Sequence, residues 1–355
     1  MRRLPGPLAH ARSHERERVV VRFGHRLLQT VLKFTVSMSF ARSLSLLSLF
    51  VLPALFAAAT PPPPTIISPL GKKMTLRFHD EFDGVRDRDG RLYIDRTKWE
   101  PTFWQGTTER TLKGNREAEI YMDKDYGGPR GKVAPAQRIN PFSFEKPGVL
   151  TISATRVPDG LRAGYGTVME RPFASGLLTT DKSFTFKYGY VEGRFKVPAN
   201  RGSWPGFWML GNDPSLGDPI KAHAWPPEID IMEFMGHWRT KFDGNVLSPK
   251  GEKTDWRLRY EKTETDLTKD FHTWAVEWNE DEIALIFDGR IWTRGKTPES
   301  LHRRMYLLLN LAVGGRWYSN EMNAAGTPAK AWEVDAASMP WKMECDYVRV
   351  YQPEE

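Results

Sequence analysis

Three acidic residues stand close together in the segment WPPEIDIMEFMGH, which begins at Trp225. Glu228, Asp230 and Glu233 interrupt an otherwise apolar run, where charged side chains are costly unless they are paired or used for chemistry. Because side chains alternate along a strand, Glu228 and Asp230 share a face and Glu233 falls on the opposite one. We expect a one-residue bulge between Asp230 and Glu233. It would turn all three acids to one face, and bulges are over-represented next to active sites.

Two long acidic side chains on one face of a sheet have the chemistry of a retaining glycosidase. Leaning toward each other, the carboxyl groups of Glu228 and Glu233 can reach the separation of about 5 to 5.5 Å that this reaction requires. Three neighbouring carboxylates repel one another, so their pKa values should separate and at least one group should keep a proton near neutral pH. The trio can supply a nucleophile, a general acid and a helper. A solvated strand face and a calcium-binding trio are the alternatives.

The run from Glu228 to Glu233 resembles the ExDxxE signature of glycoside hydrolase family 16, in the bulged form that laminarinases, agarases and carrageenases share. Other blocks resemble that family's blocks in the family's order, and together they cover the chain from about Met74 to Gln352: GNREAEIYMD, YGYVEGRFKVP, GSWPGFWML, DFHTWAVEW, MYLLLNLAVGG and DYVRVYQ. The spellings WPPEID and MYLLLNLAVGG look most similar to bacterial secreted glycanases that cut exopolysaccharides such as succinoglycan, alongside laminarinase-like 1,3-β-glucanases.

This resemblance implies an all-β fold, a concanavalin A-like β-jelly-roll sandwich with a concave substrate cleft. It implies an endo-acting, retaining β-glycanase that hydrolyses β-1,3 or β-1,3-1,4 linkages in glucan or bacterial exopolysaccharide by double displacement. By position, Glu228 is the nucleophile, Glu233 is the proton donor and later the base for water, and Asp230 is the helper. A non-catalytic carbohydrate-binding jelly roll and a transglycosylase of the same family are the alternative functions.

Candidate sugar-binding residues surround the acids. Asn115 and Glu117 match the family's cleft-lining GN-x-E segment, so we expect them to hydrogen-bond sugar hydroxyls. Flat aromatic faces with a polar edge suit a pyranose ring, although tryptophan is also a large core residue, and core packing is the equal alternative for Trp208. The tryptophans assigned to substrate binding are Trp204, Trp208, Trp225 and Trp317, and Trp104 lies in a further loop beside the expected cleft.

Two departures from the family pattern concern the substrate. Many relatives carry a histidine on the strand after the acids, where this chain places Leu247, and the loop 316–339 is longer and more polar than in a typical laminarinase. Both fall where sugar subsites are expected, so they leave the chemistry intact and the linkage open. The resemblance also implies a structural calcium ion on the convex face, with Glu81 and Asp346 as candidate ligands, and no cofactor required for the reaction.

Short strands must position these residues. Segments rich in aromatic and β-branched residues recur between turn signals, helical stretches with caps are scarce, and no βαβ rhythm is present, which favours an antiparallel sandwich or jelly roll. The sequence ALIFDGRIW carries Asp288-Gly289, a dipeptide that favours a hairpin turn. The predicted strands cover residues 75–82, 149–155, 183–188, 189–197, 206–210, 228–234, 273–278, 282–288, 305–311 and 346–351.

The net charge of +7 resides at the start of the chain. Residues 1–59 hold nine of the 51 Lys and Arg residues and two of the 44 Asp and Glu residues, which leaves 42 of each sign in the rest. A body with balanced charge does not suggest a surface that follows phosphates, so we expect no nucleic-acid partner. We expect a monomer whose partner is a polysaccharide substrate.

The basic start of the chain has the pattern of an export leader. Arg42 precedes the apolar run LSLLSLFVLPALF, and three alanines follow. This predicts a signal peptide, because the run is short for a membrane span; an uncleaved anchor is the alternative. We therefore expect a protein secreted to the extracellular or periplasmic space, with no membrane span after cleavage.

The predicted organisation has four parts. The stretch before Met38 has no clear periodicity and precedes a complete signal peptide, so Met38 is the expected true start. The parts are residues 1–37, a spurious or extended N-terminal segment; 38–59, the signal peptide; 60–73, a Pro-rich spacer; and 74–355, the catalytic domain.

Overall fold

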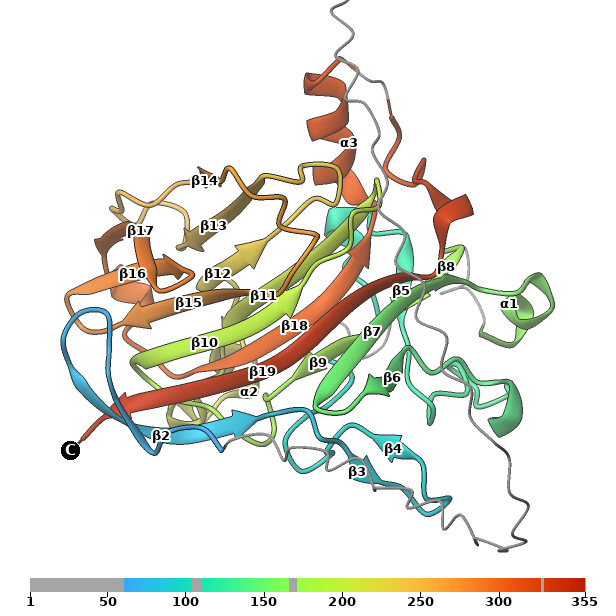
Figure 1. Cartoon of the computed structure of the whole chain (residues 1–355), viewed down its shortest axis with the longest axis horizontal. Coiled ribbons are helices and arrows are strands. Elements are labelled where there is room, and N and C mark those ends of the chain that lie inside the picture. The colour runs from blue at the N-terminus through green and yellow to red at the C-terminus, as the bar shows by residue number, and fades with distance from the viewer. Residues whose placement is uncertain (1–60, 104–109, 166–170, 327–328, 355) are drawn as a thin grey trace, which may run out of the picture. The chain divides into compact units, whose positions relative to one another are not determined.

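The computed structural model describes residues 61–103, 110–165, 171–326 and 329–354. Two β-sheets dominate these residues and pack face to face on a shared apolar core (Figure 1). This arrangement is the all-β sandwich that the short strands predict. The segments 1–37 and 38–59, predicted as an N-terminal extension and a signal peptide, lie outside the described residues.

The larger sheet has eleven strands within the described ranges, and its main path runs β17-β16-β15-β10-β19-β7-β8-β5. β2 extends it beside β19, β1 pairs with β2, and β6 pairs with β7. The pairs are antiparallel except for β5 with β8. The strands are β1 (Thr65–Ile67), β2 (Lys73–Asp80), β5 (Glu119–Tyr121), β6 (Phe142–Lys146), β7 (Val149–Arg156), β8 (Phe173–Ser175), β10 (Gly189–Lys196), β15 (His272–Trp278), β16 (Glu282–Phe287), β17 (Arg290–Lys296) and β19 (Trp341–Pro353).

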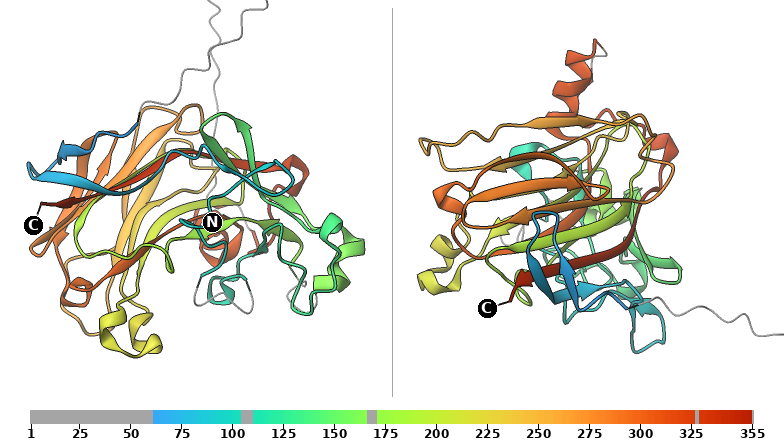
Figure 2. Two further views of the ribbon diagram at one scale, coloured as in Figure 1. Left: turned by 90° about the horizontal axis from the view of Figure 1, so that it is seen from below. Right: turned by 60° about the vertical axis from the view of Figure 1, so that its left-hand side comes forward.

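The smaller sheet has six strands in the order β14-β13-β12-β11-β18-β9, so the strand that carries the three acids, β12, lies inside the sheet between β13 and β11. Figure 2 shows the strands of the two sheets from two further sides, as curved layers. The strands of the smaller sheet are β9 (Leu177–Thr179), β11 (Ser203–Gly211), β12 (Glu228–Glu233), β13 (Lys241–Leu247), β14 (Arg259–Lys262) and β18 (Met305–Val313). A separate hairpin is formed by β3 (Val85–Arg86) and β4 (Leu92–Tyr93).

Helices are short, and α3 stands out from one end of the sheets (Figures 1 and 2). It occupies the first part of the segment 316–339, which the sequence predicts as a loop. The α-helices are α1 (Asp159–Tyr165), α2 (Pro219–Ala222) and α3 (Gly315–Ala324), and the 3-10 turns are η2 (Lys113–Asn115), η3 (Pro135–Gln137), η5 (Pro214–Leu216), η6 (Glu299–Leu301) and η7 (Ala336–Ser338).

β11 places alternate residues on the two faces of the smaller sheet. Phe207 and Met209 point into the core between the sheets, whereas Trp208 and Leu210 join a second apolar cluster on the other face. β18 pairs with β11 along its whole length and contributes to both clusters in the same alternating way. The sheet is therefore covered on both faces, one by the core and one by the walls of a cavity.

β12 contains the predicted bulge. Consecutive residues of β11 pair with Met232 and Asp230, which leaves Ile231 as the extra residue. Ile231 and Met232 both point into the core, and the alternation then resumes with the opposite parity. Glu228, Asp230 and Glu233 consequently face the same side of the sheet.

The folded domain begins earlier than the predicted boundary at residue 74. β1 lies within the predicted spacer 60–73 and pairs with β2. Ser68 Oγ also donates a hydrogen bond of 2.6 Å to buried Glu277. The spacer prediction is wrong for its second half, because β-branched residues directly after the prolines complete an edge of the larger sheet.

Two other local predictions have opposite outcomes. The Asp288-Gly289 turn between β16 and β17 is confirmed, with positive φ angles of 44° and 76°. The strand predicted for 183–188 is wrong, because this segment forms only an isolated bridge between Phe186 and Met305. Its aromatic residues are used for packing instead: the rings of Phe184 and Phe186 stack at 5.3 Å against the core.

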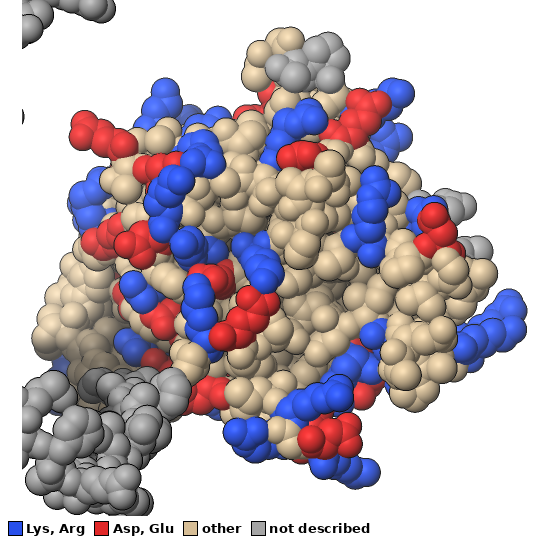
Figure 3. Space-filling view, turned by 45° about the vertical axis from the view of Figure 1, so that its right-hand side comes forward, with Lys and Arg blue, Asp and Glu red and all other residues tan. Residues whose placement is uncertain are grey.

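Charge on the surface is mixed. Basic and acidic side chains are interleaved on the face drawn in Figure 3, in keeping with the balanced composition after the first 59 residues. Within the described ranges, no helix is long and apolar enough to cross a membrane.

Candidate active site

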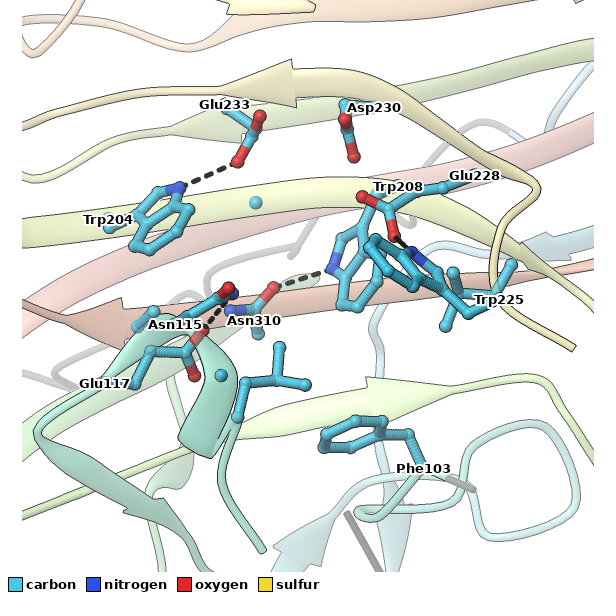
Figure 4. A pocket seen from close by; sticks show the side chains of 15 residues that line it. Phe103, Asn115, Glu117, Trp204, Trp208, Trp225, Glu228, Asp230, Glu233 and Asn310 are labelled. Atoms are coloured by element: carbon cyan, nitrogen blue, oxygen red, sulfur yellow. Dashed lines mark hydrogen bonds between the residues drawn. The ribbon is translucent and has the colours of Figure 1, made fainter. Parts of the chain in front are cut away.

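A cavity of about 290 Å³ lies on the face of the smaller sheet that is turned away from the core (Figure 4). It brings together the three acids of β12, both residues of the GN-x-E segment and three of the four assigned tryptophans. Mostly apolar walls with a few convergent polar groups are typical of a ligand-binding site. The lining residues are Phe103, Leu112, Gly114, Asn115, Glu117, Trp204, Gly206, Trp208, Leu210, Trp225, Glu228, Asp230, Glu233, Asn310 and Ala312.

Glu233 lies against the indole of Trp204, whose Nε1 donates a hydrogen bond of 3.0 Å to Glu233 Oε1 (Figure 4). Gly206 pairs directly with Glu233, and a side chain there would come within 3.0 Å of Asn310 Oδ1. Burial, followed by the negative charge of Glu228, raises the pKa of Glu233 to about 8. Glu233 is therefore protonated at neutral pH, with open space in front of it.

Glu228 has a different environment. Trp225 Nε1 donates a hydrogen bond of 2.6 Å to Glu228 Oε2. Burial raises the pKa of Glu228, whereas hydrogen bonds to Asp230 and Trp225 act to lower it. Donors that favour the ionised form are what a nucleophilic carboxylate requires.

Asp230 lies between the two glutamates and is 4% exposed. Burial, then the negative charges of Glu228 and Glu233, raises its pKa well above the ordinary value. The raised pKa favours the protonated form of Asp230, which can donate a hydrogen bond to Glu228. The solvated strand face does not describe such a buried group, and the described residues contain no group of three or more His, Cys, Asp or Glu side chains that could hold a metal ion.

A chain of hydrogen bonds crosses the floor of the cavity. Trp208 Nε1 donates to Asn310 Oδ1 at 2.9 Å, and Asn310 Nδ2 donates to the Tyr121 hydroxyl at 2.9 Å. This hydroxyl donates to Glu117 Oε2 at 3.1 Å, and Asn115 Nδ2 donates to Glu117 Oε1 at 3.0 Å. Both oxygens of Glu117 are thus engaged, so Glu117 orients Asn115 and Tyr121 at the edge of the cavity.

The tryptophans divide into three kinds. Trp204 and Trp225 contact the catalytic candidates directly. Trp208 fits both the core-packing and the substrate-binding interpretation, since it is only 9% exposed yet lines the cavity. Trp317 is not among the lining residues. Its ring packs edge-on against Trp204 at 5.0 Å, so it supports that ring from α3. Trp104 lies outside the described residues.

Several residues of this site were not predicted from the sequence: Phe103, Tyr121, Asn310 and Asp243. Asn310 and Asp243 share a recognisable signal, because each is a polar residue within a strand that is otherwise largely buried. Leu247, at the position where the family resemblance leads us to expect a histidine, pairs with Glu228 across β12 and β13.

Asp243 is a buried acid that faces Glu233. It lies on β13 directly opposite Glu233 and is fully buried. Its carboxyl group interacts with that of Glu233 through a side-chain hydrogen bond, and no other described residue donates to it. Burial, then the negative charge of Glu233, raises the pKa of Asp243 well above its ordinary value.

The substitution Asp243→Asn should stabilise the protein at pH 8. A carboxyl group whose pKa is raised by folding costs stability as the pH rises above its unfolded-state pKa of about 3.9, because the folded state resists ionisation. Asparagine does not ionise. We expect the free energy of unfolding to rise by about 1 to 3 kcal/mol at pH 8 and to change little at pH 4, as measured by denaturant titration.

Asp288→Asn provides the matched control, because hydrogen bonds from His272 and Thr273 lower the pKa of Asp288 against the effect of burial. The same substitution there should destabilise the protein at pH 8. An unfolding free energy of Asp243→Asn that falls at pH 8 would contradict the placement of a buried carboxyl group with a raised pKa beside Glu233.

The two predicted calcium ligands are occupied otherwise. Glu81 accepts hydrogen bonds of 3.1 and 2.6 Å from the guanidinium of Arg349, and Asp346 is paired with Arg194. A cation would have to compete with both arginines. The geometry therefore does not fit a calcium site built on these two acids.

Comparison with known families decides the relationship of this chain. The model of glycosyl hydrolases family 16 matches residues 101–334, about two thirds of the sequence. The chain belongs to glycosyl hydrolase family 16. The match includes every residue that lines the cavity, so the predicted family resemblance is confirmed.

Curated relatives of this family 16 chain include two proteins of Rhizobium meliloti (strain 1021). Endo-1,3-1,4-beta-glycanase ExsH is 34% identical over 285 residues, and endo-1,3-1,4-beta-glycanase EglC is 33% identical over 283 residues. Each alignment covers 78% of this chain and 52% of the relative. The chain therefore spans about half the length of these relatives.

Among solved structures, the endo-beta-1,3-glucanase from Pyrococcus furiosus is similar with a TM-score of 0.60 and 29% identity. The likeness covers 82% of this chain and 98% of that structure. It confirms the predicted family 16 jelly roll.

Proposed function

We propose that this chain is an endo-acting, retaining β-glycanase that hydrolyses β-1,3 or β-1,3-1,4 linkages in glucan or bacterial exopolysaccharide. One observation carries the proposal: a bulge aligns Glu228, Asp230 and Glu233 on one face, where they line the same cavity in different environments. The activities for which the rhizobial relatives and the Pyrococcus furiosus glucanase are named support the linkage.

Glu228 is the nucleophile in this proposal. Its carboxylate attacks the anomeric carbon, the bond to the leaving sugar oxygen breaks, and a glycosyl ester with Glu228 results. The hydrogen bond from Trp225 stabilises the ionised carboxylate before attack. Protonated Asp230 supplies a second donor and adds no further negative charge beside the nucleophile.

Glu233 is the acid and then the base. With a pKa of about 8 it carries a proton at neutral pH, which it transfers to the leaving oxygen as that bond breaks. Once ionised, it takes a proton from water, and the water oxygen attacks the anomeric carbon and releases Glu228. Each carboxyl group returns to its starting protonation state, and the product keeps the β configuration.

Trp225→Phe should move the acidic limb of the pH profile. Removal of the indole donor raises the pKa of Glu228, so kcat/KM should reach its plateau only at higher pH. We expect kcat/KM at pH 5 to fall by about fivefold, the factor that corresponds to about 1 kcal/mol for one hydrogen bond, while the limb near pH 8 stays in place. The measurement is the pH profile of kcat/KM on one soluble glucan.

Trp256→Phe is the matched control. It also removes an indole donor, here the 2.8 Å hydrogen bond to the Lys296 carbonyl, but Trp256 does not line the cavity. An unchanged acidic limb in Trp225→Phe would contradict the role of this indole in holding Glu228 ionised.

The function itself is tested with laminarin, mixed-linkage glucan, succinoglycan and agarose as substrates. Endo-hydrolysis should shorten the chains of at least one of the first three rapidly, and proton NMR at early times should show a β-anomeric reducing end. Binding without cleavage of any of them would favour the carbohydrate-binding alternative. Elongated products would indicate transglycosylation.

The predicted leader adds a proposal about location. We propose that residues 38–59 direct export of the protein. The relatives support this proposal, because they are glycanases and such enzymes act on polysaccharides. N-terminal sequencing of the protein from the medium or periplasm should begin near residue 60, whereas an intact leader would contradict cleavage.

A further inference from the structure

A second cavity beside the first has a basic character. The residues that line it are Lys113, Arg116, Arg171, Ser319, Ala329, Lys330, Ala331 and Trp332. Half of these eight lining residues carry a positive charge, and none of them is acidic. Lys330 also has an ion pair of 3.4 Å with Glu333, which lies outside the lining set.

Arg171 is the distinctive residue of this cavity. It is 9% exposed, and its Nη1 atom is buried without a hydrogen-bond partner in the described part of the chain. The guanidinium lies over the ring of Trp332, 5.3 Å from the centroid. The described residues give it no carboxylate partner, and a buried charge without one is costly. An anionic ligand would supply that partner.

The basic cavity adjoins the candidate active site along one short segment. Along η2 and the residues after it, Gly114, Asn115 and Glu117 line the first cavity, whereas Lys113 and Arg116 line the second. The two cavities therefore share one short wall, and a chain of sugars in the first can reach the second through a substituent.

α3 borders both cavities. A side chain at Gly315 would lie 3.1 Å from the ring of Trp204 and 3.2 Å from the Asn115 carbonyl, so the start of α3 touches the first cavity. Ser319, one turn later, lines the second. Trp332 Nε1 donates a hydrogen bond of 2.8 Å to the Arg116 carbonyl, which ties the basic cavity to the η2 segment.

We propose that the basic cavity is a subsite for a carboxylate substituent on the polysaccharide bound in the first cavity. A guanidinium can bind a carboxylate through two parallel hydrogen bonds, and Arg116 and Lys113 add charge nearby. Trp332, 38% exposed, offers an aromatic face for the sugar that bears the substituent. The inference rests on the proposed function and names the substrate class more closely: a glycan with acidic substituents.

The test compares two derivatives of the same laminarin, one esterified with succinate and one acetylated to the same degree. Both esters block the same kind of hydroxyl, but only the succinyl half-ester adds a negative charge. We expect kcat/KM for the succinylated glucan to exceed that for the acetylated one at low salt, and the advantage to shrink as ionic strength rises.

Arg171→Gln and Arg116→Gln should each lower kcat/KM for the succinylated glucan by about tenfold, the factor expected when one charged hydrogen bond is lost. Values for the acetylated glucan should stay within about twofold. Arg116 is exposed, so its substitution tests the subsite even if Arg171→Gln does not fold. Arg88→Gln removes the charge of another exposed arginine, which lies outside both cavities. It should leave kcat/KM unchanged for both derivatives.

The outcomes separate this inference from the proposed function. Hydrolysis of both derivatives with no effect of either variant on their ratio would overturn the subsite and leave the glycanase intact. If neither derivative is cleaved, the glycanase proposal fails. Calorimetric binding of the two derivatives to the wild type and Arg116→Gln then decides the subsite alone: equal affinities would overturn it. Free succinate that competes as well as the succinylated glucan would show binding of a small anion only and would also overturn it.

Discussion

Glu228→Gln should abolish hydrolysis while polysaccharide binding survives. The amide keeps the size of the side chain and can still accept the hydrogen bond from Trp225, but it cannot form the glycosyl ester. We expect kcat on laminarin or mixed-linkage glucan to fall at least about a thousandfold, with an affinity for the glucan within a few-fold of the wild type. Reducing-end release and affinity electrophoresis provide the two measurements.

Stability and chemical rescue separate the loss of a nucleophile from the loss of the fold. Glu228 is a buried carboxyl group whose pKa is raised mainly by burial, so its neutralisation should leave the melting temperature at pH 8 unchanged or higher. In Glu228→Ala, azide can enter the space of the missing carboxylate and attack from that face. The product should be an α-glycosyl azide, because only one inversion takes place.

Glu145→Gln is a suitable control for this experiment, since Glu145 pairs with Lys342 on the surface and is not among the residues that line the first cavity. It should retain full activity. Turnover by Glu228→Gln above a few per cent of the wild type would overturn the role assigned to Glu228.

The activity that Glu233→Gln loses should depend on the leaving group of the substrate. General acid catalysis contributes about 10² to 10⁴ in rate, and the natural leaving group, a sugar alkoxide, needs that proton. We expect kcat on the polysaccharide to fall within this range. An aryl glycoside of a short glucan, whose leaving phenolate needs little protonation, should form the glycosyl ester at a nearly normal rate and show a burst of phenol.

The alkaline limb of the pH profile provides an independent test of Glu233 as the proton donor. Activity in the wild type should decline as the pH rises through the pKa of Glu233, about 8, because the proton donor ionises. This decline should be absent for Glu233→Gln on the aryl glycoside. Azide rescue of Glu233→Ala should give a β-glycosyl azide, the opposite anomer to that from Glu228→Ala. The same anomer from both variants would contradict the assignment of the two roles.

Much of the fold could be predicted from local patterns. The strands with clear alternation or apolar runs, such as β7, β10, β15 and β16, match their predicted ranges within about one residue at each end. The failures have a common cause. In 183–188 the aromatic residues satisfy the core without pairing, and β1 is too short to be distinguished from the proline-rich stretch before it. Whether each of these two segments pairs as a strand depends on the distant segment that lies beside it, and the local sequence pattern does not contain that information.

The candidate site was predicted in part. The three acids lie within six residues of one another, so one strand with one bulge is enough to place them together on one face of the sheet. Asn310 on β18 and Tyr121 on β5 come from strands far away in the chain, and a hydrogen bond joins the two. Asp243 comes from β13, the next strand in the chain, and the pairing of β13 with β12 places it opposite Glu233. Trp317 was assigned to the substrate by its residue type, but the helix that carries it places it behind Trp204.

By itself, the sequence determined the all-β class, the acid strand with its bulge and the family, because alternation, turn chemistry and the order of motifs are local properties of the chain. The tertiary structure decided the electrostatics. The pKa of Glu233 near 8, the raised pKa of Asp243 and the buried guanidinium of Arg171 all result from burial beside particular neighbours. Desolvation and charge coupling act through space, over distances that only the packed sheets define.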